Sequence, residues 1–305
     1  MAGMKVWVPL PGIAQALGDL PGVEVGVYDG GAEFPPGVED VEVWVPPFFG
    51  TPRTPEALAR MARLRVVQTL TAGVDAYRPH MPDGVLLCNA KGVHDAGTAE
   101  WVVGAILAMQ HDFPAFDEAR REERWDYRFT GALADQTVLI VGYGSIGAAV
   151  ERRLAGFEVE VVRVARTARD GVHGEDELPA LLPDADVVVL LVPSTPATAG
   201  LADAAFLSRM KDGALLVNAA RGPVVDTGAL VAELNSRRIR AALDVTDPEP
   251  LPAGHPLWKA PGVLITPHVA GSTPASGRRA LKLLRAQLER LLAGEPLVNV
   301  IEGAY

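Results

Sequence analysis

Arg221, Asp244 and His268 each follow an apolar run typical of a buried strand by one to three residues. In an open parallel α/β sheet, ligands bind outside the carboxyl ends of the strands, so these positions are candidates for chemistry. The runs are Ala214–Asn218, Ile239–Leu243 and Val263–Thr266.

Each of these residue types suits a defined task. An arginine can hold a substrate carboxylate and stabilise charge on a carbonyl oxygen, although Arg221 could equally form a salt bridge to a neighbouring loop. A histidine beside a carboxylate favours the protonated ring and can act as a general acid near neutral pH, although a lone histidine is more often structural. Glu249 lies between two prolines on what we expect to be a rigid loop, where the alternative is a surface charge.

A glycine-rich turn predicts a dinucleotide site. Val138–Val141 runs into Gly142, Gly144 and Gly147, spaced as G-x-G-x-x-G, and a helix is expected from Ser145 to about Gly156. Gly142 would allow the tight turn, Gly144 the approach of the pyrophosphate, and Gly147 the close packing of helix on strand. The helix amides would then face the anion, whereas the alternative is a simple strand-helix turn.

The end of the next strand indicates which dinucleotide binds. Ala165 stands where an acid usually binds the adenine ribose, and Arg166, Thr167 and Arg169 follow it. Arginines and a hydroxyl would bind a 2′-phosphate that an acid would repel. We therefore predict a preference for NADP(H), with NAD(H) also possible. The alternative is that the arginines are solvated surface charges. Asp244 could accept a hydrogen bond from the nicotinamide carboxamide or simply cap a turn.

Short β-rich runs alternate with helical stretches along most of the 305 residues, which predicts α/β architecture with doubly wound parallel sheets. The first part suggests a flavodoxin-like domain and the second a Rossmann-like domain with six strands. The expected strands of the first part are Val6–Pro9, Val23–Tyr28, Val41–Val45, Arg65–Thr69 and Val85–Cys88, with a helical piece at Pro55–Ala62. Those of the second are Thr137–Val141, Glu158–Val164, Asp186–Val192 and the three runs named above.

Two helices set the expected domain boundaries. A long helix is predicted from near Thr98, which suits an N-cap, and the last helix is predicted from Pro274 to Gly294. The last helix would return the chain to the first domain. We expect a discontinuous domain of residues 1–97 and 275–305 and a dinucleotide domain of residues 98–274.

Composition excludes several classes of protein. The net charge of −10 without a basic block argues against a nucleic-acid partner, and no apolar stretch is long enough for a membrane span. The single cysteine, Cys88, permits no internal disulfide and lies in an apolar run, so we expect a buried, inert thiol and a cytoplasmic protein. No metal ligand set is expected.

Four ordered motifs resemble the D-isomer-specific 2-hydroxyacid dehydrogenase family, which includes phosphoglycerate dehydrogenases and glyoxylate/hydroxypyruvate reductases. The resemblance covers nearly the whole chain. The motifs are Gly142–Gly147, Asn218–Asp226, Ala242–Pro250 and Thr266–Ser272. The chain departs from the family at Thr246-Asp247, where an aromatic residue and a glutamate are frequent, and at Thr227, where a glutamate is frequent.

The resemblance implies hydride transfer between NAD(P)H and a small 2-keto or 2-hydroxy acid in the interdomain cleft of a homodimer that associates through the cofactor domain. It makes Arg221 the substrate-binding arginine, His268 the acid/base and Glu249 its carboxylate partner. The segment Leu70–Asp75 is similar to the loop whose amides hold the substrate carboxylate, here those of Ala72, Gly73 and Val74. Further expected cofactor contacts are Ser145, Ile146, Pro193, Thr198, Ala219, Ala220, Arg221, Asp244, His268 and Gly271.

Other activities share this scaffold. A formate-oxidising site tends to pair its histidine with glutamine, so Glu249 counts against it. A phosphite-type dehydrogenase and a dinucleotide-sensing corepressor remain as alternatives. Phe48, Phe49 and Trp258 lie on loops and could line an apolar substrate pocket or serve packing alone.

Overall fold

A computed structural model describes residues 3–48 and 50–302, and the chain divides into two compact units. Unit 1 comprises residues 1–94 and 274–305, and unit 2 comprises residues 95–273. Helix α3 (Asp95–Gln110) opens unit 2 three residues before the predicted start. Thr98 is a buried residue inside this helix, so the prediction of Thr98 as an N-cap is wrong.

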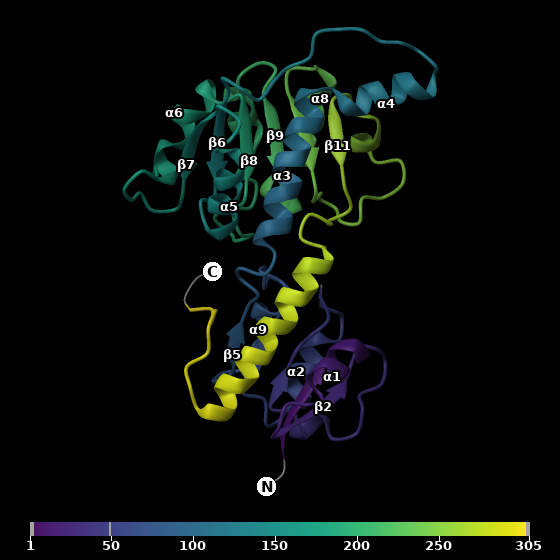
Figure 1. Ribbon diagram of the computed structural model, residues 1–305, viewed down its shortest axis with the longest axis vertical. Helices are drawn as coiled ribbons and strands as arrows, with labels where there is room; N and C mark the ends of the chain where they lie inside the picture. Colours follow the sequence, from purple (N-terminus) through teal and green to yellow (C-terminus); the bar gives the residue numbers. More distant parts are fainter. Residues whose placement is uncertain (1–2, 49, 303–305) are drawn as a thin grey trace. The chain divides into compact units, whose positions relative to one another are not determined.

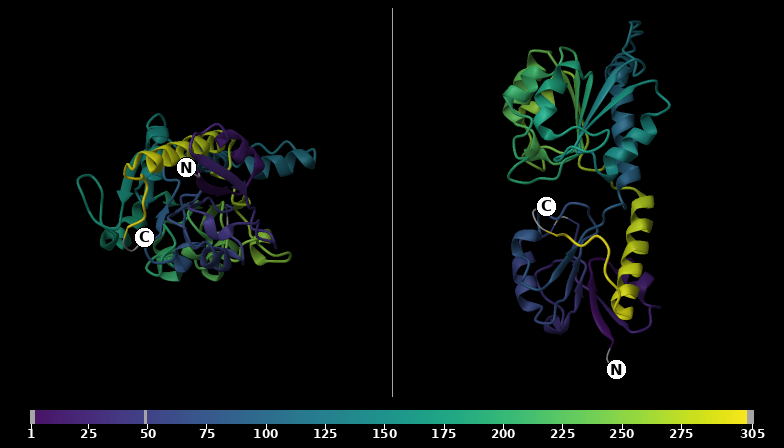
Figure 2. Two further views of the ribbon diagram at one scale, coloured as in Figure 1. Left: turned by 90° about the horizontal axis from the view of Figure 1, so that it is seen from below. Right: turned by 90° about the vertical axis from the view of Figure 1, so that its left-hand side faces the viewer.

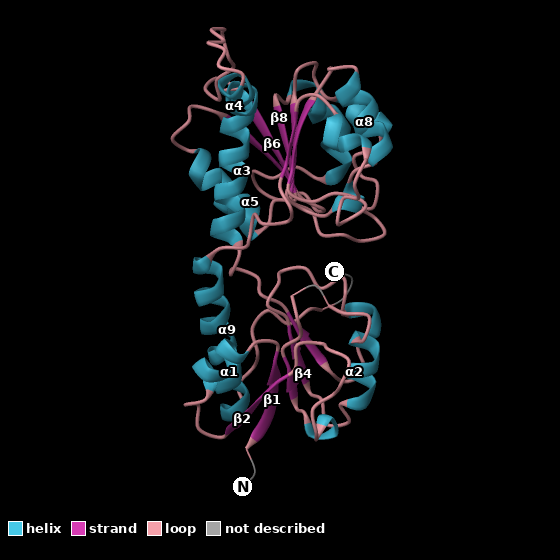
Figure 3. Ribbon diagram, turned by 90° about the vertical axis from the view of Figure 1, so that its right-hand side faces the viewer, coloured by secondary structure: helices cyan, strands magenta, loops and turns pink. Residues whose placement is uncertain are grey.

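Unit 1 is a three-layer α/β fold (Figure 3). Its parallel sheet has the order β2-β1-β3-β4-β5, which is that of a flavodoxin-like fold. In Figure 3, α1 and α9 cover one face of the sheet and α2 covers the other. The strands are β1 (Met4–Val8), β2 (Val23–Val27), β3 (Val43–Trp44), β4 (Val66–Gln68) and β5 (Leu86–Cys88). The helices are α1 (Pro11–Leu17), α2 (Thr54–Arg60) and α9 (Pro274–Ala293), with short 3-10 turns at Val38–Asp40 and Arg78–His80.

Alternation along β1 explains how this sheet is covered on both faces. Val6 and Val8 point into the cluster beneath α9, which contributes Leu284 and Leu288, whereas Trp7 packs in the cluster on the other face. Successive strand residues face opposite sides, and a parallel sheet covered on both sides needs apolar residues at each. Gly294 adopts a left-handed φ of 69° directly after α9, as the predicted helix end requires.

Unit 2 holds a second parallel sheet, of order β11-β10-β9-β8-β6-β7. Helices α3 and α5 pack on one face, while α6, α7 and α8 lie on the other (Figures 1 and 3). The strands are β6 (Thr137–Val141), β7 (Glu160–Val164), β8 (Val187–Leu190), β9 (Leu215–Asn218), β10 (Arg240–Leu243) and β11 (Val263–Ile265). The helices are α4 (Phe113–Arg121), α5 (Ser145–Leu154), α6 (Leu178–Leu181), α7 (Ala204–Arg209) and α8 (Thr227–Asn235), with 3-10 turns at Glu175–Glu177, Leu182–Asp184, Gly222–Val224 and Pro256–Lys259.

The strand order of unit 2 reverses between β6 and β8. The chain runs from β6 outward to β7 and then crosses back to β8, on the other side of β6. Such a switch point leaves a crevice at the carboxyl ends of the two central strands. The predicted α/β class and both parallel sheets are therefore confirmed, with strands that are mostly shorter than expected.

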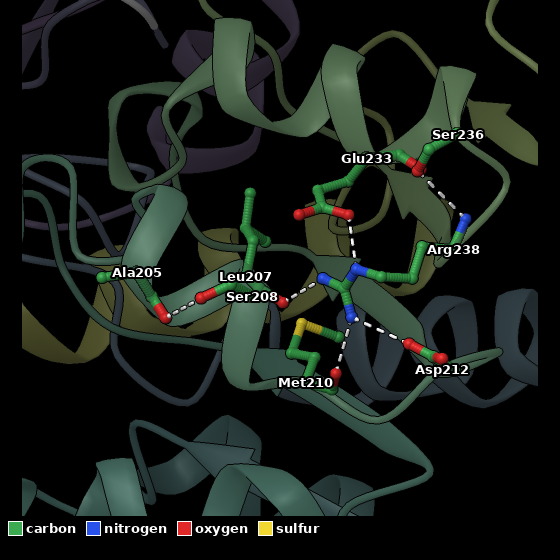
Figure 4. A network of polar contacts seen from close by, with 8 residues as sticks. All are labelled: Ala205, Leu207, Ser208, Met210, Asp212, Glu233, Ser236 and Arg238. Atoms are coloured by element: carbon green, nitrogen blue, oxygen red, sulfur yellow. Dashed lines mark hydrogen bonds and ion pairs between the residues drawn. The ribbon is translucent and has the colours of Figure 1, made fainter.

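The partly buried side chain of Arg238 connects α7 and α8, the helices that precede and follow β9 in the chain. Arg238 donates from Nε to Glu233 of α8 at 2.6 Å, from Nη1 to the Met210 carbonyl at 2.7 Å, and from Nη2 to the Leu207 carbonyl of α7 (Figure 4). These bonds join α7 to α8 next to the amino end of β9, where the Gly213 amide donates to the Arg238 carbonyl at 2.7 Å.

Helix α4 and the segment after it extend away from the sheet of unit 2 (Figures 1 and 2). Trp125, Tyr127 and Phe129 in this arm are between 83% and 95% exposed. Large aromatic side chains are seldom left so exposed without a partner. No helix within the described residues has both the length and the apolar content to span a membrane.

Candidate active site

His268 and Glu249 form a close pair beyond the carboxyl ends of β10 and β11. His268 Nδ1 lies 2.6 Å from Glu249 Oε1, and both side chains are partly exposed. His268 has a left-handed φ of 54°, and its amide donates to the Asp244 carbonyl at 2.7 Å. The pairing expected from the resemblance thus has direct geometric support.

Asp244 holds the turn that carries His268. Its carboxylate is 3% exposed and accepts from Thr266 Oγ1 at 2.6 Å, from the Val269 amide at 2.9 Å and from the Ala270 amide at 2.9 Å. A carboxylate has two acceptor oxygens, so it can accept all three of these hydrogen bonds at once. A contact from Asp244 to a nicotinamide stays a prediction.

The Arg221 loop is pinned at the end of β9. The Asn218 side chain donates to the Arg221 carbonyl at 3.0 Å and accepts from the Ala220 amide at 3.0 Å. Arg221 is partly buried, and its Nη1 donates to the Ala220 carbonyl at 2.7 Å. This places the guanidinium beside the strand end rather than in an extended surface position.

Gly222 brings the Arg221 loop against the loop that carries Glu249. A Cβ at residue 222 would overlap the Thr246 carbonyl group and lie 2.8 Å from the Asp247 nitrogen. Only glycine permits two backbones to approach so closely. Thr227 Oγ1 donates to the Asp247 carbonyl at 2.9 Å, and Thr246 Oγ1 donates to the Pro248 carbonyl at 2.9 Å. The two threonines that depart from the family pattern therefore stabilise the conformation of the loop that carries Glu249.

The glycine-rich turn has the geometry that a pyrophosphate needs. Gly142 has a φ of 99°, and a Cβ there would lie 2.6 Å from the backbone of Leu191, at the end of β8. A Cβ at Gly147 would lie 3.2 Å from the Gly142 carbonyl, whereas a Cβ at Gly144 would meet nothing within 4 Å. The first amides of α5 follow at Ser145 and Ile146, which are partly exposed. This turn, at the β6–β8 switch point, fits a dinucleotide phosphate.

The predicted arginine cluster lies beside this turn. Arg166, Thr167 and Arg169 are exposed, and Arg169 Nη2 donates to the Tyr143 carbonyl at 2.7 Å with its guanidinium 5.8 Å from the ring centre. Arg169 is therefore held against the glycine-rich motif and is not only a solvated charge. Tyr143, which the sequence analysis did not single out, provides this support.

A second arginine steadies Tyr143 from its other end. The Tyr143 hydroxyl donates to Glu151 of α5, which is paired with Arg163 of β7. The Arg163 guanidinium holds the pKa of Glu151 below its usual range. The ionised Glu151 thus remains an acceptor for both side chains.

The remaining cofactor candidates of unit 2 lie on the same sheet edge. Thr198 Oγ1 donates to the Pro193 carbonyl at 2.6 Å and so closes the loop after β8. The Ala219 amide donates to the Leu190 carbonyl of β8 at 3.3 Å, and the Gly271 carbonyl accepts from the Thr273 amide at 3.1 Å. Among the described residues, no group of three or more His, Cys, Asp or Glu side chains could hold a metal ion.

The candidate carboxylate loop lies in unit 1, after β4. Ala72 and Gly73 are partly buried and Val74 is buried. The side chains of Thr69, directly after β4, and Asn89, directly after β5, donate to carbonyl groups of this loop. Phe48 is 39% exposed, and Phe49 lies outside the described residues. Trp258 is 53% exposed, and its indole donates to the Pro252 carbonyl at 2.9 Å. A pocket role for these aromatic residues stays a prediction.

Comparison with known proteins shows the family. Residues 103–270 match the model for the NAD binding domain of D-isomer specific 2-hydroxyacid dehydrogenases. The chain is 35% identical over 257 residues to a glyoxylate reductase of Thermofilum pendens, covering 79% of this chain and 75% of the relative. It is 33% identical over 281 residues to a glyoxylate/hydroxypyruvate reductase A of Yersinia enterocolitica, covering 86% of each.

A solved structure agrees over the full length. The D-isomer specific 2-hydroxyacid dehydrogenase from Xanthobacter autotrophicus Py2, in complex with NADPH and MES, superimposes with a TM-score of 0.85 at 33% identity, covering 99% of this chain and 98% of that one. This chain therefore belongs to the D-isomer specific 2-hydroxyacid dehydrogenase family and is an NAD(P)-dependent oxidoreductase that acts on the CH–OH group of 2-hydroxy acids.

Proposed function

We propose that the enzyme reduces a small 2-keto acid of the glyoxylate/hydroxypyruvate type with NADPH. The observation that carries the proposal is the 2.6 Å His268–Glu249 pair beside the Arg221 loop, at the carboxyl edge of a dinucleotide-type sheet. The two reductases that share 33–35% identity with the chain support this substrate class, and the NADPH complex of the similar structure supports the cofactor.

Residues of unit 2 would hold the cofactor. The Gly142–Gly147 turn and the first α5 amides suit the pyrophosphate, and Arg166, Thr167 and Arg169 suit a 2′-phosphate. When bound, the reduced nicotinamide supplies the hydride that reduces the keto carbon. The expected nicotinamide-side contacts are Pro193, Thr198, Ala219, Ala220, Asp244 and Gly271.

The reacting group would be served by three side chains. Glu249 orients the imidazole of His268 through Nδ1, so His268 donates its proton from Nε2 to the carbonyl oxygen. Arg221 binds the substrate carboxylate and stabilises the charge that develops on that oxygen. In unit 1, the family resemblance assigns binding of a substrate carboxylate to the Ala72, Gly73 and Val74 amides.

A panel of 2-keto acids with each of NADPH and NADH tests the proposal. We expect turnover of glyoxylate and hydroxypyruvate, a decline with bulkier keto acids and a lower KM for NADPH. A lower KM for NADH would reject the cofactor assignment, and turnover of phosphite without turnover of keto acids would reject the substrate class.

Replacement of His268 tests the proton donor. His268→Ala should lower kcat by about 10²–10⁴-fold, the usual contribution of general acid catalysis. The matched control is His173→Ala, because His173 also pairs with a glutamate, Glu177, at 2.8 Å. Near wild-type kcat in His268→Ala, or an equal loss in His173→Ala, would contradict the assignment.

We infer that the enzyme is a cytoplasmic homodimer that associates through unit 2, and that it binds neither nucleic acid nor membranes. The exposed aromatic side chains Trp125, Tyr127 and Phe129 of the arm support this association, because an apolar surface of this kind is stabilised by a partner. The acidic net charge and the single buried Cys88 support the rest. Light scattering should give a dimer, and Trp125→Ser with Phe129→Ser should give a monomer, whereas the exposed control Trp258→Ser should remain dimeric.

A further inference from the structure

Three successive backbone carbonyl groups in the loop after β4 accept hydrogen bonds from side chains. Thr69 Oγ1 donates to the Thr71 carbonyl at 2.8 Å, and Thr71 Oγ1 donates to the Gly73 carbonyl at 2.7 Å. Between them, Asn89 Nδ2 donates to the Ala72 carbonyl at 2.7 Å. Such a run of side-chain donors to consecutive carbonyls is not needed to close an ordinary turn.

These hydrogen-bonded carbonyls determine where the amides point. In a trans peptide the C=O and N–H groups point in opposite directions. The cis peptide bonds found in the described residues lie elsewhere, before Pro248 and Pro250. The bond from Asn89 therefore directs the Gly73 N–H away from Asn89, and the bond from Thr71 directs the Val74 N–H away from the Thr71 hydroxyl. Neither amide donates a hydrogen bond to an acceptor among residues 3–48 and 50–302.

Asn89 is itself held in one orientation. It is 5% exposed, and its Oδ1 accepts from the Lys91 amide at 3.1 Å, so its NH2 group is the one that faces the Ala72 carbonyl. Its carbonyl accepts from Gln68 Nε2 at 3.1 Å, and Gln68 Oε1 accepts from Gln287 of α9 at 2.9 Å. Gln68 and Gln287 are also buried. A satisfied buried polar chain of this kind is rigid, because breaking any one bond leaves a buried group unpaired.

Of the two residues, Val74 is buried and Gly73 is partly exposed, so the Gly73 N–H is the amide that a ligand can reach. We propose that Asn89 and Thr71 are positioning residues that hold the two peptide groups flanking Gly73 and so preorganise its amide for the carboxylate of the keto acid. A fixed amide donor suits a carboxylate, because an ionised oxygen binds an oriented N–H group strongly. Preorganisation matters because amides that must first be ordered would bind the anion more weakly. The inference deepens the proposed function and rests on it, since it assigns the structural source of carboxylate recognition.

The test measures binding of oxamate, an unreactive 2-keto acid analogue, to the NADPH-loaded enzyme by calorimetry, together with KM and kcat for glyoxylate. Thr71→Val removes the hydroxyl at nearly constant volume, Thr71→Ser retains it, and Asn89→Ala removes the amide donor. Ser208→Ala is the control, because Ser208 Oγ also donates to a backbone carbonyl, that of Ala205, but in α7 (Figure 4).

We expect Thr71→Val and Asn89→Ala each to raise the dissociation constant of oxamate and the KM for glyoxylate by about tenfold, the effect of one net hydrogen bond. The dissociation constant for NADPH should not change, Thr71→Ser should restore oxamate affinity, and Ser208→Ala should bind like the wild type. If Asn89→Ala fails to fold, the Thr71 pair decides alone.

Two results would overturn the inference while leaving the proposed function intact. In the first, the wild-type enzyme binds oxamate and the Thr71→Val variant binds it with the same dissociation constant. The other is a variant that loses NADPH and oxamate affinity to the same degree, since that shows general loss of structure. A wild-type enzyme that neither binds oxamate nor reduces keto acids would overturn both.

Discussion

Asp244→Asn is the substitution that most directly separates the geometry of the His268 turn from the chemistry of His268. The side chain keeps its size, and only one of its two oxygens becomes an NH2 group. In the native protein the two oxygens together accept three hydrogen bonds, from Thr266, Val269 and Ala270. An asparagine cannot satisfy all three donors, because its NH2 group would face an N–H or O–H group.

The cost follows from burial. Asp244 is 3% exposed and Ala270 is 5% exposed, so water cannot replace a lost acceptor. One buried donor left unpaired costs about 1–3 kcal/mol, and the remaining two bonds lose their charge assistance, which roughly doubles the strength of such bonds. We expect the free energy of unfolding of unit 2 to fall by about 2–5 kcal/mol. Because a shift of about 1 Å in a catalytic group can cost about 10²-fold in rate, kcat should fall by a similar factor.

The assay combines urea denaturation followed by circular dichroism with steady-state kinetics. Thr266→Val serves as the graded comparison, because it removes one donor to Asp244 and leaves the carboxylate intact, and it should cost only about 1 kcal/mol. An Asp244→Asn enzyme with wild-type unfolding free energy and wild-type kcat would refute the role of Asp244 as the anchor of the turn.

Three further predictions concern the cofactor arginine, the loop contact and the thiol. Arg169→Ala should raise the KM for NADPH about 10–100-fold, as expected for one hydrogen bond to a charged group, and leave the KM for NADH unchanged; equal changes with both cofactors would contradict it. Gly222→Ala should destabilise unit 2 by about 1–3 kcal/mol and lower kcat, because the new Cβ meets the Thr246 backbone, whereas Gly156→Ala, with no atom within 4 Å of its Cβ, should do neither. Burial raises the pKa of the Cys88 thiol from 9.0 to about 11, so a thiol reagent at pH 8 should label Cys88 only after unfolding. Between these two pKa values the native state keeps the Cys88 proton, whereas the unfolded state loses it. The contribution of Cys88 to the unfolding free energy is therefore complete below pH 9 and disappears as the pH rises to about 11. The difference in unfolding free energy between wild type and Cys88→Ala should change by about 2–3 kcal/mol over that window, and a constant difference would contradict the assignment.

Features encoded by short segments could be predicted from the sequence. The alternating apolar runs predicted both parallel sheets, because strands and helices each have a characteristic hydrophobic periodicity that can be read within a short segment. The spacing of the three glycines in Gly142–Gly147 predicted a tight turn. In the structure a Cβ at Gly142 or Gly147 would lie close to neighbouring atoms, whereas a Cβ at Gly144 would meet nothing within 4 Å. The start of α3 was missed, because Thr98 has the side chain of an N-cap yet is buried within the helix.

The candidate residues Arg221, Asp244 and His268 could also be placed from sequence, because parallel strands end at one edge of their sheet and each residue follows a strand. That argument locates a residue but not its contacts. It did not show that the Asp244 carboxylate accepts hydrogen bonds from the amides that follow His268, or that Arg169 donates to the Tyr143 carbonyl.

By itself, then, the sequence determined the architecture, the dinucleotide turn and the identity of the strand-end residues, since these depend on residue type, periodicity and chain order. Only the tertiary structure decided which groups those residues contact. The Gly222–Thr246 approach and the Asn89–Ala72 hydrogen bond join segments 24 and 17 residues apart through loops of irregular conformation. Such contacts depend on how whole loops pack, and no local pattern in the sequence encodes that packing.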